Sequence, residues 1–420
     1  MTENVDQFND DELHAPAWLN AQFLGEILST YKKDPELKVT DLEITPGTAQ
    51  GDHYASVMFR AKVEYTTSIG KFSKSLIIKT MPEVEGAKKD MLAESHLFET
   101  EIGMYSKVLP EFERILREAG DSTKLYVPCI YHSLEPRQVI VFEDLVPQGY
   151  SVMRDRSPTL VELKAVYSKL AKLHAISMKV LNEQPEFLKE FKYGMCGMPA
   201  FLDTPMVTSG MPNFLNMLDK TPELLKYKPY FAKINESYMQ RQAKVLEEYR
   251  KNRQPDGFYV LSHGDFHLRN MMFKNNKESG EFDDVMLLDF QISNIAPPTV
   301  DLIYSVYLLM DAEQRWNLKE ELINYYFSVL NHTLRKIKFK GKIPSQDRLW
   351  ELILHHKYYD FFLATTFLPN ILAVQENTYK LEDIIMNDEI RQKTYFSEKV
   401  IQDFSKLLPE YEKLGYFKNL

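Results

Sequence analysis

The residues best suited to chemistry lie in one short loop and at the end of the strand predicted to follow it. Residues 263–270 read His-Gly-Asp-Phe-His-Leu-Arg-Asn, so Asp265 and Asn270 are five positions apart. Asp289 comes nineteen residues later and ends the apolar run 285–288. In phosphoryl-transfer enzymes of the kinase type, an aspartate accepts the proton of the acceptor hydroxyl, while an asparagine five positions on and a later aspartate hold magnesium. We therefore predict that Asp265 is the general base and that Asn270 and Asp289 bind Mg²⁺.

The same loop has two other interpretations. A polar turn between two strands is the simpler one, but it leaves unexplained why four ionisable or metal-competent residues gather there. His263 and His267 are four positions apart, which is the spacing of a zinc pair on a helix. Gly264 and the polar setting argue against a helix, and the sequence shows no obvious third ligand. We expect His263 to brace the loop backbone, and the sequence assigns no role to His267.

Features that would serve ATP precede this loop along the chain. A turn containing Gly51 and Asp52 joins two predicted strands and could lay backbone N–H groups over phosphates, although an ordinary hairpin has the same pattern. Lys79 ends the strand predicted after that turn, and a lysine in that place can reach the α- and β-phosphates of ATP. The order of glycine turn and strand lysine therefore predicts a nucleotide site.

A glutamate on the next predicted helix completes the set. Glu101 lies beside the apolar face of that helix and is predicted to pair with the lysine, whereas Glu94 and Glu99 are weaker candidates that face solvent. A further strand then enters the segment from Glu143 to Leu145, whose backbone groups are expected to bind adenine. A nucleotide would thus contact several separate elements of the N-terminal region.

The hydrophobic periodicity predicts an α+β protein with a change of composition near residue 145. Residues 1–145 read as a small, β-rich ATP-binding lobe with one main helix, and residues 146–420 as a large, mostly helical catalytic and substrate lobe. In the first part, strands are expected at 39–44, 54–65, 72–80, 127–131 and 138–142, and the helix at 88–108. In the second, helical patterns occur at 159–181, 209–219, 228–251, 299–310, 313–337, 347–366 and 396–413, with strands at 258–261, 272–273 and 285–288.

Composition narrows the class of protein. The 420 residues carry a net charge of −9. This charge argues against a protein that binds nucleic acid and against one that binds an anionic membrane surface. The two cysteines, Cys129 and Cys196, form no Cys-x-x-Cys pair and suit a reducing compartment. The N-terminus lacks the order of a signal peptide, and the apolar stretches 301–310 and 361–374 fall short of the roughly 20 residues that span a bilayer. We expect a cytoplasmic protein with no obligate protein partner.

Taken in order, these motifs resemble the ecdysteroid kinase-like family, the CHK kinase-like domain, over roughly residues 40–375. The segments that carry the resemblance are 51–56, 76–79, 98–105, 142–145, 263–270, 288–291 and 298–302. The family is related to choline kinases and aminoglycoside phosphotransferases. The resemblance implies a protein-kinase-like bilobal fold, ATP and Mg²⁺ as cofactors, and phosphorylation of a small-molecule hydroxyl, with ecdysteroids and detoxified xenobiotics as known or proposed substrates. It assigns the family's roles to Lys79, Glu101, Asp265, Asn270 and Asp289. His53 departs from the asparagine expected at that position.

Three functions remain open at this stage. A kinase for an apolar alcohol such as an ecdysteroid is favoured because the aromatic stretch 358–372 could line a pocket, although a plain core helix fits that stretch as well. A choline- or aminoglycoside-type kinase would need acidic or aromatic side chains around a cation, and scattered acids such as Glu351 and Asp360 could converge in the fold. A non-catalytic ligand-binding protein is the third.

Two further polar residues have structural interpretations. His174 lies on a predicted helix and is expected to be a core histidine with satisfied hydrogen bonds. Asp301 is expected either to cap the start of its own helix or to hydrogen-bond the catalytic loop.

Overall fold

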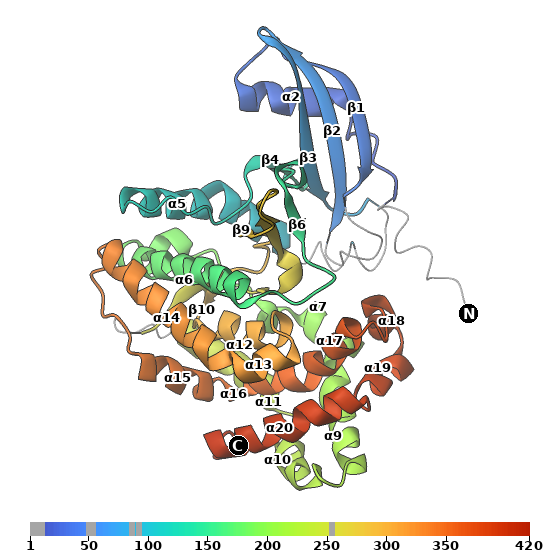
Figure 1. Ribbon diagram of the computed structural model, residues 1–420, viewed down its shortest axis with the longest axis vertical. Helices are drawn as coiled ribbons and strands as arrows, with labels where there is room; N and C mark the ends of the chain where they lie inside the picture. The colour runs from blue at the N-terminus through green and yellow to red at the C-terminus, as the bar shows by residue number, and fades with distance from the viewer. Residues whose placement is uncertain (1–12, 48–55, 84–88, 90–94, 252–256) are drawn as a thin grey trace. The chain divides into compact units, whose positions relative to one another are not determined.

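The computed structural model describes residues 13–47, 56–83, 89, 95–251 and 257–420, and Figure 1 traces the chain through them. The chain divides into two compact units, each built from segments that are distant in sequence. The described residues of Met1–Arg114, Lys124–Val152 and Met272–Gln291 form the first unit, and those of Ile115–Thr123, Met153–Met271 and Ile292–Leu420 form the second. Residues 272–291, which include Asp289, thus fold with the N-terminal part of the chain.

The first unit is built on a five-stranded antiparallel sheet in the order β1-β2-β3-β5-β4. Its strands are β1 (Lys38–Pro46), β2 (Val57–Thr67), β3 (Gly70–Thr80), β4 (Cys129–Ser133) and β5 (Val139–Glu143). Alternate residues of β2 from Val57 to Tyr65 are buried, as expected for a strand with one face on a core. Helix α2 (Ala21–Lys32) covers that face with Leu24, Ile27 and Leu28 (Figure 1).

A long helical segment begins in the first unit and differs from the predicted helix at 88–108. It consists of α4 (Leu97–Gly103), a π-helical turn (Met104–Val108) and α5 (Leu109–Glu118), while residues 90–94 lie outside the described part. The predicted end at residue 108 was wrong, because the helical segment continues to Glu118. A proline in the first turn of a helix is tolerated, and here it opens α5 after the π-helical turn.

A second, three-stranded sheet of the first unit carries the segment before Asp289. Its order is β6-β8-β9, with β6 (Tyr150–Val152), β8 (Met271–Asn275) and β9 (Phe282–Leu287). The short 3-10 turn Val146–Gln148 leads into β6. The sequence pattern missed β6, because three residues are too few to show a period of two.

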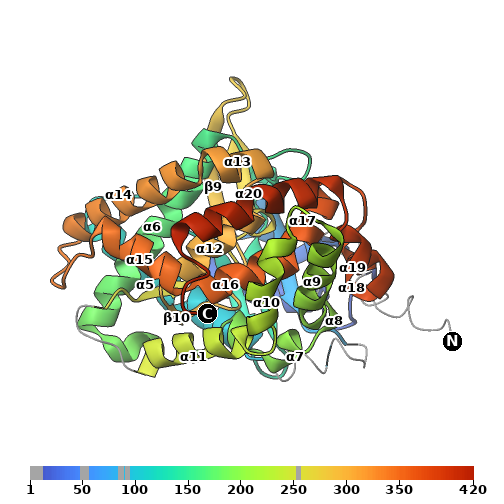
Figure 2. The ribbon, with the colours of Figure 1, turned by 90° about the horizontal axis from the view of Figure 1, so that it is seen from below.

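The second unit is mostly helical, with one two-stranded antiparallel ladder of β7 (Val260–Ser262) and β10 (Asn294–Ala296). Helices α6 (Leu160–Glu183) and α14 (Lys319–Lys336) lie side by side (Figures 1 and 2). The other longer helices are α9 (Gly210–Lys220), α10 (Lys228–Ile234), α11 (Tyr238–Lys251), α12 (Thr299–Leu308), α15 (Gln346–His355), α17 (Leu368–Gln375) and α20 (Glu398–Leu414). Shorter helical segments are α7 (Pro199–Leu202), α8 (Pro205–Thr208), α13 (Ala312–Asn317), α16 (Lys357–Phe362), the π-helical Leu363–Phe367, α18 (Leu381–Met386) and α19 (Asp388–Thr394). Turns of 3-10 helix lie at Pro185–Leu188, Met195–Gly197, Leu225–Tyr227 and Leu268–Asn270.

The predicted α+β class is confirmed by this mixture of a small sheet-based unit and a helical one. The two apolar stretches at 301–310 and 361–374 are buried core helices, as expected. Within the residues that the structure describes, no helix is both long and apolar enough to cross a membrane. Neither Cys129 nor Cys196 forms a disulfide in the part of the chain that the structure describes.

Candidate active site

Three elements of the first unit bring a lysine, a glutamate and an aspartate together. Lys79 lies on the central strand β3, with Met58 of β2 and Ile140 of β5 as its register partners. Its Nζ donates to Glu101 Oε2 of α4 at 2.6 Å and to Asp289 Oδ1 at 3.0 Å. The side chains of Lys79 and Glu101 are 5% and 2% exposed, so this ion cluster is almost fully removed from water.

The charged groups of this cluster shift one another's pKa values. Burial alone would lower the pKa of Lys79, but Asp289 and Glu101 raise it well above its usual range. Burial raises the pKa of Glu101 to about 7; the ammonium of Lys79 opposes this rise and Asp289 adds to it. Lys79 therefore stays a cation at neutral pH, shared between two carboxyl groups, and its Nζ also donates to Gln291 Oε1 at 3.3 Å.

Asp289 has a backbone conformation that a side chain rarely adopts. Its φ is 59°, in the left-handed region, two residues after the end of β9 at Leu287. A non-glycine residue there costs of order 1 kcal/mol or more and often marks a functional site. This turn directs the carboxylate of Asp289 back to Lys79 and leaves its side chain 20% exposed.

The loop 263–270 lies in the second unit and holds Asp265 through several donors. Tyr304 Oη of α12 donates to Asp265 Oδ1 at 2.7 Å, and Asn270 Nδ2 donates to Asp265 Oδ2 and to its backbone oxygen, both at 3.0 Å. His267 Nε2 lies 3.3 Å from Asp265 Oδ1, while its Nδ1 accepts from the backbone N–H of Arg269. The ring proton is therefore on Nε2 and points at the carboxylate.

These donors keep Asp265 ionised. Burial would raise the pKa of Asp265, but the neighbouring ring of His267, the hydroxyl of Tyr304 and the ring of His263 hold it well below its usual range. Burial and the Asp265 charge raise the pKa of Tyr304, so that hydroxyl keeps its proton and donates. The arrangement presents a fixed, charged carboxylate, as a general base requires.

Asp301 binds the backbone of the loop 263–270. Its two carboxylate oxygens accept from the backbone N–H groups of His263 at 2.7 Å and Gly264 at 2.8 Å, so the helix-cap alternative was wrong and the loop alternative is confirmed. His174 is fully buried, with Nε2 2.9 Å from Asp301 and Nδ1 2.7 Å from Tyr326 Oη. It is the satisfied core histidine that the sequence predicted.

Each unit contains a side-chain oxygen of the kind that binds magnesium, on Asp289 in the first unit and on Asn270 in the second. Mg²⁺ prefers oxygen ligands and usually takes one or two carboxylates, leaving other positions to water and phosphate. Asp289 offers a partly exposed carboxylate, and Asn270 uses its amide nitrogen for Asp265, which directs its oxygen elsewhere. In the described part of the chain, no three His, Cys, Asp or Glu side chains group to hold a metal ion, so a protein-only cage such as a zinc site is not seen there.

The remaining candidate residues fall in different places. Gly51, Asp52 and Glu94 lie outside the described residues. Glu143 ion-pairs with Lys74, and its backbone N–H donates to the oxygen of Pro128. The backbone oxygen of Leu145 accepts from Gln148 and Tyr150, and its side chain is buried. Any adenine contact there must use the other backbone groups of the segment.

Sequence reasoning missed two partners of the Asp265 carboxylate, Tyr304 and His267. A signal for Tyr304 existed, because it follows Asp301 by three positions on a helix and therefore lies on the same face. For His267 the signal was its place two residues after Asp265 within one loop. Neither spacing alone indicates a hydrogen bond.

No curated protein matches the chain. Among solved structures, an AMP-bound spectinomycin phosphotransferase, APH(9)-Ia, is 13% identical with a TM-score of 0.40, covering 96% of this chain and 100% of its own. The choline kinase LicA of Streptococcus pneumoniae is 11% identical with a TM-score of 0.35, covering 93% and 98%. At such values these likenesses carry no argument about function.

The family assignment rests on a different comparison. The model of the ecdysteroid kinase-like family matches residues 50–339, which is more than half of the chain. The matched part includes Lys79, Glu101, the loop with Asp265, and Asp289. The chain therefore belongs to the ecdysteroid kinase-like family, and its fold is of the α+β class.

Proposed function

We propose that the protein is an ATP-dependent kinase that transfers the γ-phosphoryl group to a hydroxyl of an apolar alcohol, such as an ecdysteroid or a xenobiotic. The observation that carries this proposal is the carboxylate of Asp265. Three side chains position it, and it stays charged at neutral pH. An isolated structural turn has no need of a carboxylate held in this way.

In the proposed reaction, Asp265 accepts the proton of the acceptor hydroxyl while the oxygen attacks the γ-phosphorus. Tyr304 and His267 hold the carboxylate by its Oδ1, and Asn270 holds it by Oδ2. Because these donors fix the orientation of the carboxylate before substrate arrives, the acceptor hydroxyl meets a base already in place.

In the first unit, Lys79 would bind the α- and β-phosphates and Glu101 would position it. Asp289 of the first unit and Asn270 of the second unit are each proposed as a ligand of Mg²⁺, which would offset the charge of the triphosphate. The segment from Glu143 to Leu145 is proposed to bind adenine. Contacts of Gly51 and Asp52 with the phosphates stay a prediction.

The surroundings of Asp265 favour an apolar acceptor. The ring of Tyr304, which donates to Asp265, lies 6.3 Å from the ring of Phe367. Phe367 in turn packs against Phe201 at 6.4 Å and Phe362 at 5.5 Å between ring centroids. Aromatic side chains thus gather on the Tyr304 side of the base, and Phe362 and Phe367 come from the aromatic stretch 358–372.

A cationic acceptor has less support. The choline-type alternative needs acids such as Glu351 and Asp360 to converge, and both do line one cavity. That cavity, however, is lined by Leu302, Ile303, Val306 and Tyr307 of α12, whereas Tyr304 of the same helix points at Asp265.

The test is mass spectrometry of products formed by purified protein with Mg-ATP and a panel of steroids, plant phenolics, glycosides, choline and aminoglycosides. Asp265→Asn and Asp289→Ala are run in parallel, with Asp41→Asn, an exposed carboxylate of β1, as the matched control. We expect one added phosphate on an apolar alcohol with the wild type and the control, and none with the other two.

Two results would contradict the proposal. Phosphorylation of only choline or aminoglycosides would favour the cationic-acceptor alternative. Tight ATP binding without any product would favour a ligand-binding protein that has lost catalysis.

A further inference from the structure

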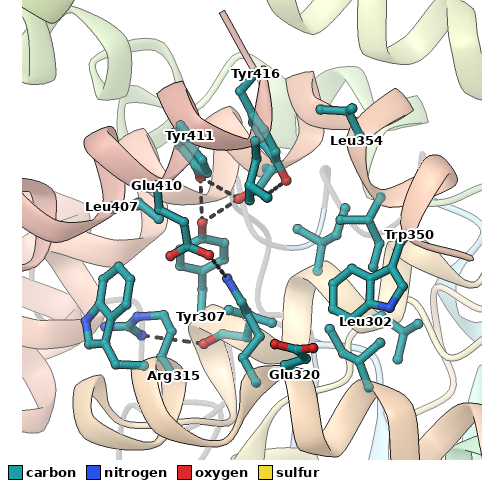
Figure 3. A pocket seen from close by; sticks show the side chains of 18 of the residues that line it. Leu302, Tyr307, Arg315, Glu320, Trp350, Leu354, Leu407, Glu410, Tyr411 and Tyr416 are labelled. Atoms are coloured by element: carbon teal, nitrogen blue, oxygen red, sulfur yellow. Dashed lines mark hydrogen bonds and ion pairs between the residues drawn. The ribbon is translucent and has the colours of Figure 1, made fainter. Parts of the chain in front are cut away.

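The helical unit contains a ligand-sized cavity of about 570 Å³ that the proposed reaction does not use. Its walls come from α12, α13, α14, α15, α16 and α20, and Figure 3 shows most of the side chains that line it. Apolar residues such as Leu302, Val306, Ile323, Leu354 and Leu407 form most of the wall, together with Trp350. Cavities of a few hundred Å³ with apolar walls and a few polar groups are typical small-molecule sites.

One buried carboxylate, Asp360, opens onto this cavity. Its Oδ1 accepts from the hydroxyls of Tyr307 and Tyr411, the latter at 2.6 Å, and its Oδ2 accepts from Tyr416 at 2.8 Å. Dashed lines in Figure 3 mark the hydrogen bonds made by these tyrosines. Asp360 is only 7% exposed. A carboxylate accepts about four hydrogen bonds, so one acceptor position is left for a ligand.

No cation pairs with Asp360 among the residues that the structure describes. The two basic side chains of the cavity are engaged elsewhere: Lys319 pairs with Glu410 at 2.7 Å, and Arg315 pairs with Asp403. Burial raises the pKa of Asp360, and the hydrogen bonds from the three tyrosine hydroxyls, together with the charge of Lys319, oppose that rise. Burying a carboxylate without a cation beside it costs free energy. A ligand that brings a positive charge into the cavity would offset this cost.

The side chains at the edge of the cavity are acidic, like Asp360 inside it. Glu320 and Asp347 line it, are exposed, and have no cationic partner in the described part of the chain. Glu351 also lines it and pairs with Arg348 at 3.1 Å, but both side chains are more than half exposed, so that pair is weak. Clefts lined by charges of one sign attract ligands of the opposite sign.

The cavity is separate from the catalytic carboxylate. Side chains of a helix advance by about 100° per residue. On α12, Leu302, Ile303, Val306 and Tyr307 therefore share one face, the face that lines the cavity, while Tyr304 projects from the other face to Asp265. A ligand in this cavity would contact α12 without contacting Asp265.

We propose that this cavity binds an apolar molecule that carries a protonated amine. The ammonium group would take the remaining acceptor position of Asp360 beside the tyrosine hydroxyls, and the hydrocarbon body would pack against the aliphatic wall and Trp350. Trp350 is half-buried and can also contribute a cation–π contact.

Three probes with one hydrocarbon cage and different charge test this proposal: adamantylmethylamine, adamantylmethanol and adamantanecarboxylate. Trp316 and Trp350 line the cavity, and Trp18 is the third tryptophan of the chain. Tryptophan fluorescence of a Trp18→Phe protein therefore reports on the cavity, and calorimetry supplies Kd. ATP is left out, so the result does not depend on the proposed reaction.

We expect the amine to bind tightest and the carboxylate weakest. Asp360→Asn should weaken amine binding by about tenfold to a hundredfold and leave alcohol binding unchanged. Leu354→Trp, at a partly exposed wall position, should block all three probes. Asp265→Asn should not alter any Kd, because the catalytic carboxylate lies on the other face of α12.

Asp360 is buried, so its variant requires a back-up in case it does not fold. Glu320→Gln and Asp347→Asn at the exposed edge should each lower amine affinity without affecting the alcohol, and Asp41→Asn in the first unit should not. The proposal is overturned if no probe binds, if the alcohol binds as tightly as the amine, if Leu354→Trp leaves binding intact, or if neither edge variant weakens the amine.

Discussion

Replacing Lys79 by methionine should destabilise the first unit far more than replacing its partner Glu101 by glutamine. The cluster contains one cation and two carboxyl groups, with Nζ to oxygen distances of 2.6 and 3.0 Å. Lys79→Met removes the cation and leaves Glu101 and Asp289 facing each other without a counterion. Glu101→Gln leaves Lys79 paired with Asp289, and the amide oxygen can still accept its hydrogen bond.

The expected magnitudes follow from burial. Removing one partner of a buried ion pair costs about 3–5 kcal/mol. We expect Lys79→Met at the upper end of that range, because the side chains of Glu101 and Asp289 are only 2% and 20% exposed. Glu101→Gln should cost about 1–2 kcal/mol, as a weakened hydrogen bond does. The double variant should be more stable than Lys79→Met alone.

The pH dependence has a defined sign. The pKa of Glu101 is raised to about 7 from an ordinary value of 4.5, so the folded protein binds the proton more readily than the unfolded chain. Its contribution to stability is complete below pH 4.5 and is lost as the pH rises through 7. Without Lys79 this carboxyl group binds its proton still more strongly. The destabilisation caused by Lys79→Met should therefore be larger at pH 8 than at pH 6.

Urea unfolding followed by the fluorescence of Trp18 measures this effect. Trp18 is the one tryptophan in the sequence of the first unit, so Trp316→Phe/Trp350→Phe protein reports on that unit alone. A cost for Glu101→Gln equal to or above that of Lys79→Met would refute the reasoning, as would a smaller cost for Lys79→Met at pH 8 than at pH 6.

Three further predictions concern single residues of the second unit. His267→Ala removes a donor from Asp265 and raises its pKa, so the acidic limb of a kcat–pH profile should move to higher pH; an unmoved limb would contradict this. Burial lowers the pKa of His356 to about 3. The neutral ring therefore stabilises the fold above pH 6.5, and this contribution falls by about 1.4 kcal/mol per pH unit as the pH is lowered. In urea unfolding between pH 7 and 5, the free energy of unfolding should change less with pH in His356→Asn than in the wild type. Gly264→Ala should cost about 2–4 kcal/mol, because φ is +88° and a Cβ would lie 2.4 Å from the oxygen of Ile292; wild-type stability in urea would exclude this clash.

Hydrophobic periodicity was sufficient to predict the strands and helices in which apolar residues recur regularly over many positions. Strands β1 to β3 lie within a few residues of their predicted ranges, since alternation over nine to eleven residues defines a half-buried strand. Helical spacing also placed Glu101 beside the buried face of α4, where the structure shows it in contact with Lys79.

Short elements and long-range contacts could not be predicted. β10 has only three residues, and a period of two is not visible over that length. Tyr304 contacts Asp265 across 39 positions of sequence, and Asp360 gathers three tyrosines from two other helical regions. Such contacts depend on how helices pack and not on spacing within any one of them. The cytoplasmic location and the absence of an obligate partner stay predictions.

The lysine shared by Glu101 and Asp289 gives the ligand-free protein an internal counterion. Because Lys79 Nζ already neutralises Asp289 Oδ1, the fold of the first unit has no need of an external ion at that carboxylate. The protein should consequently unfold at the same urea concentration with and without a chelator. Phosphates that draw the ammonium away would free Asp289 for a metal, so nucleotide and metal are expected to enter together, as an exchange of one cation for another.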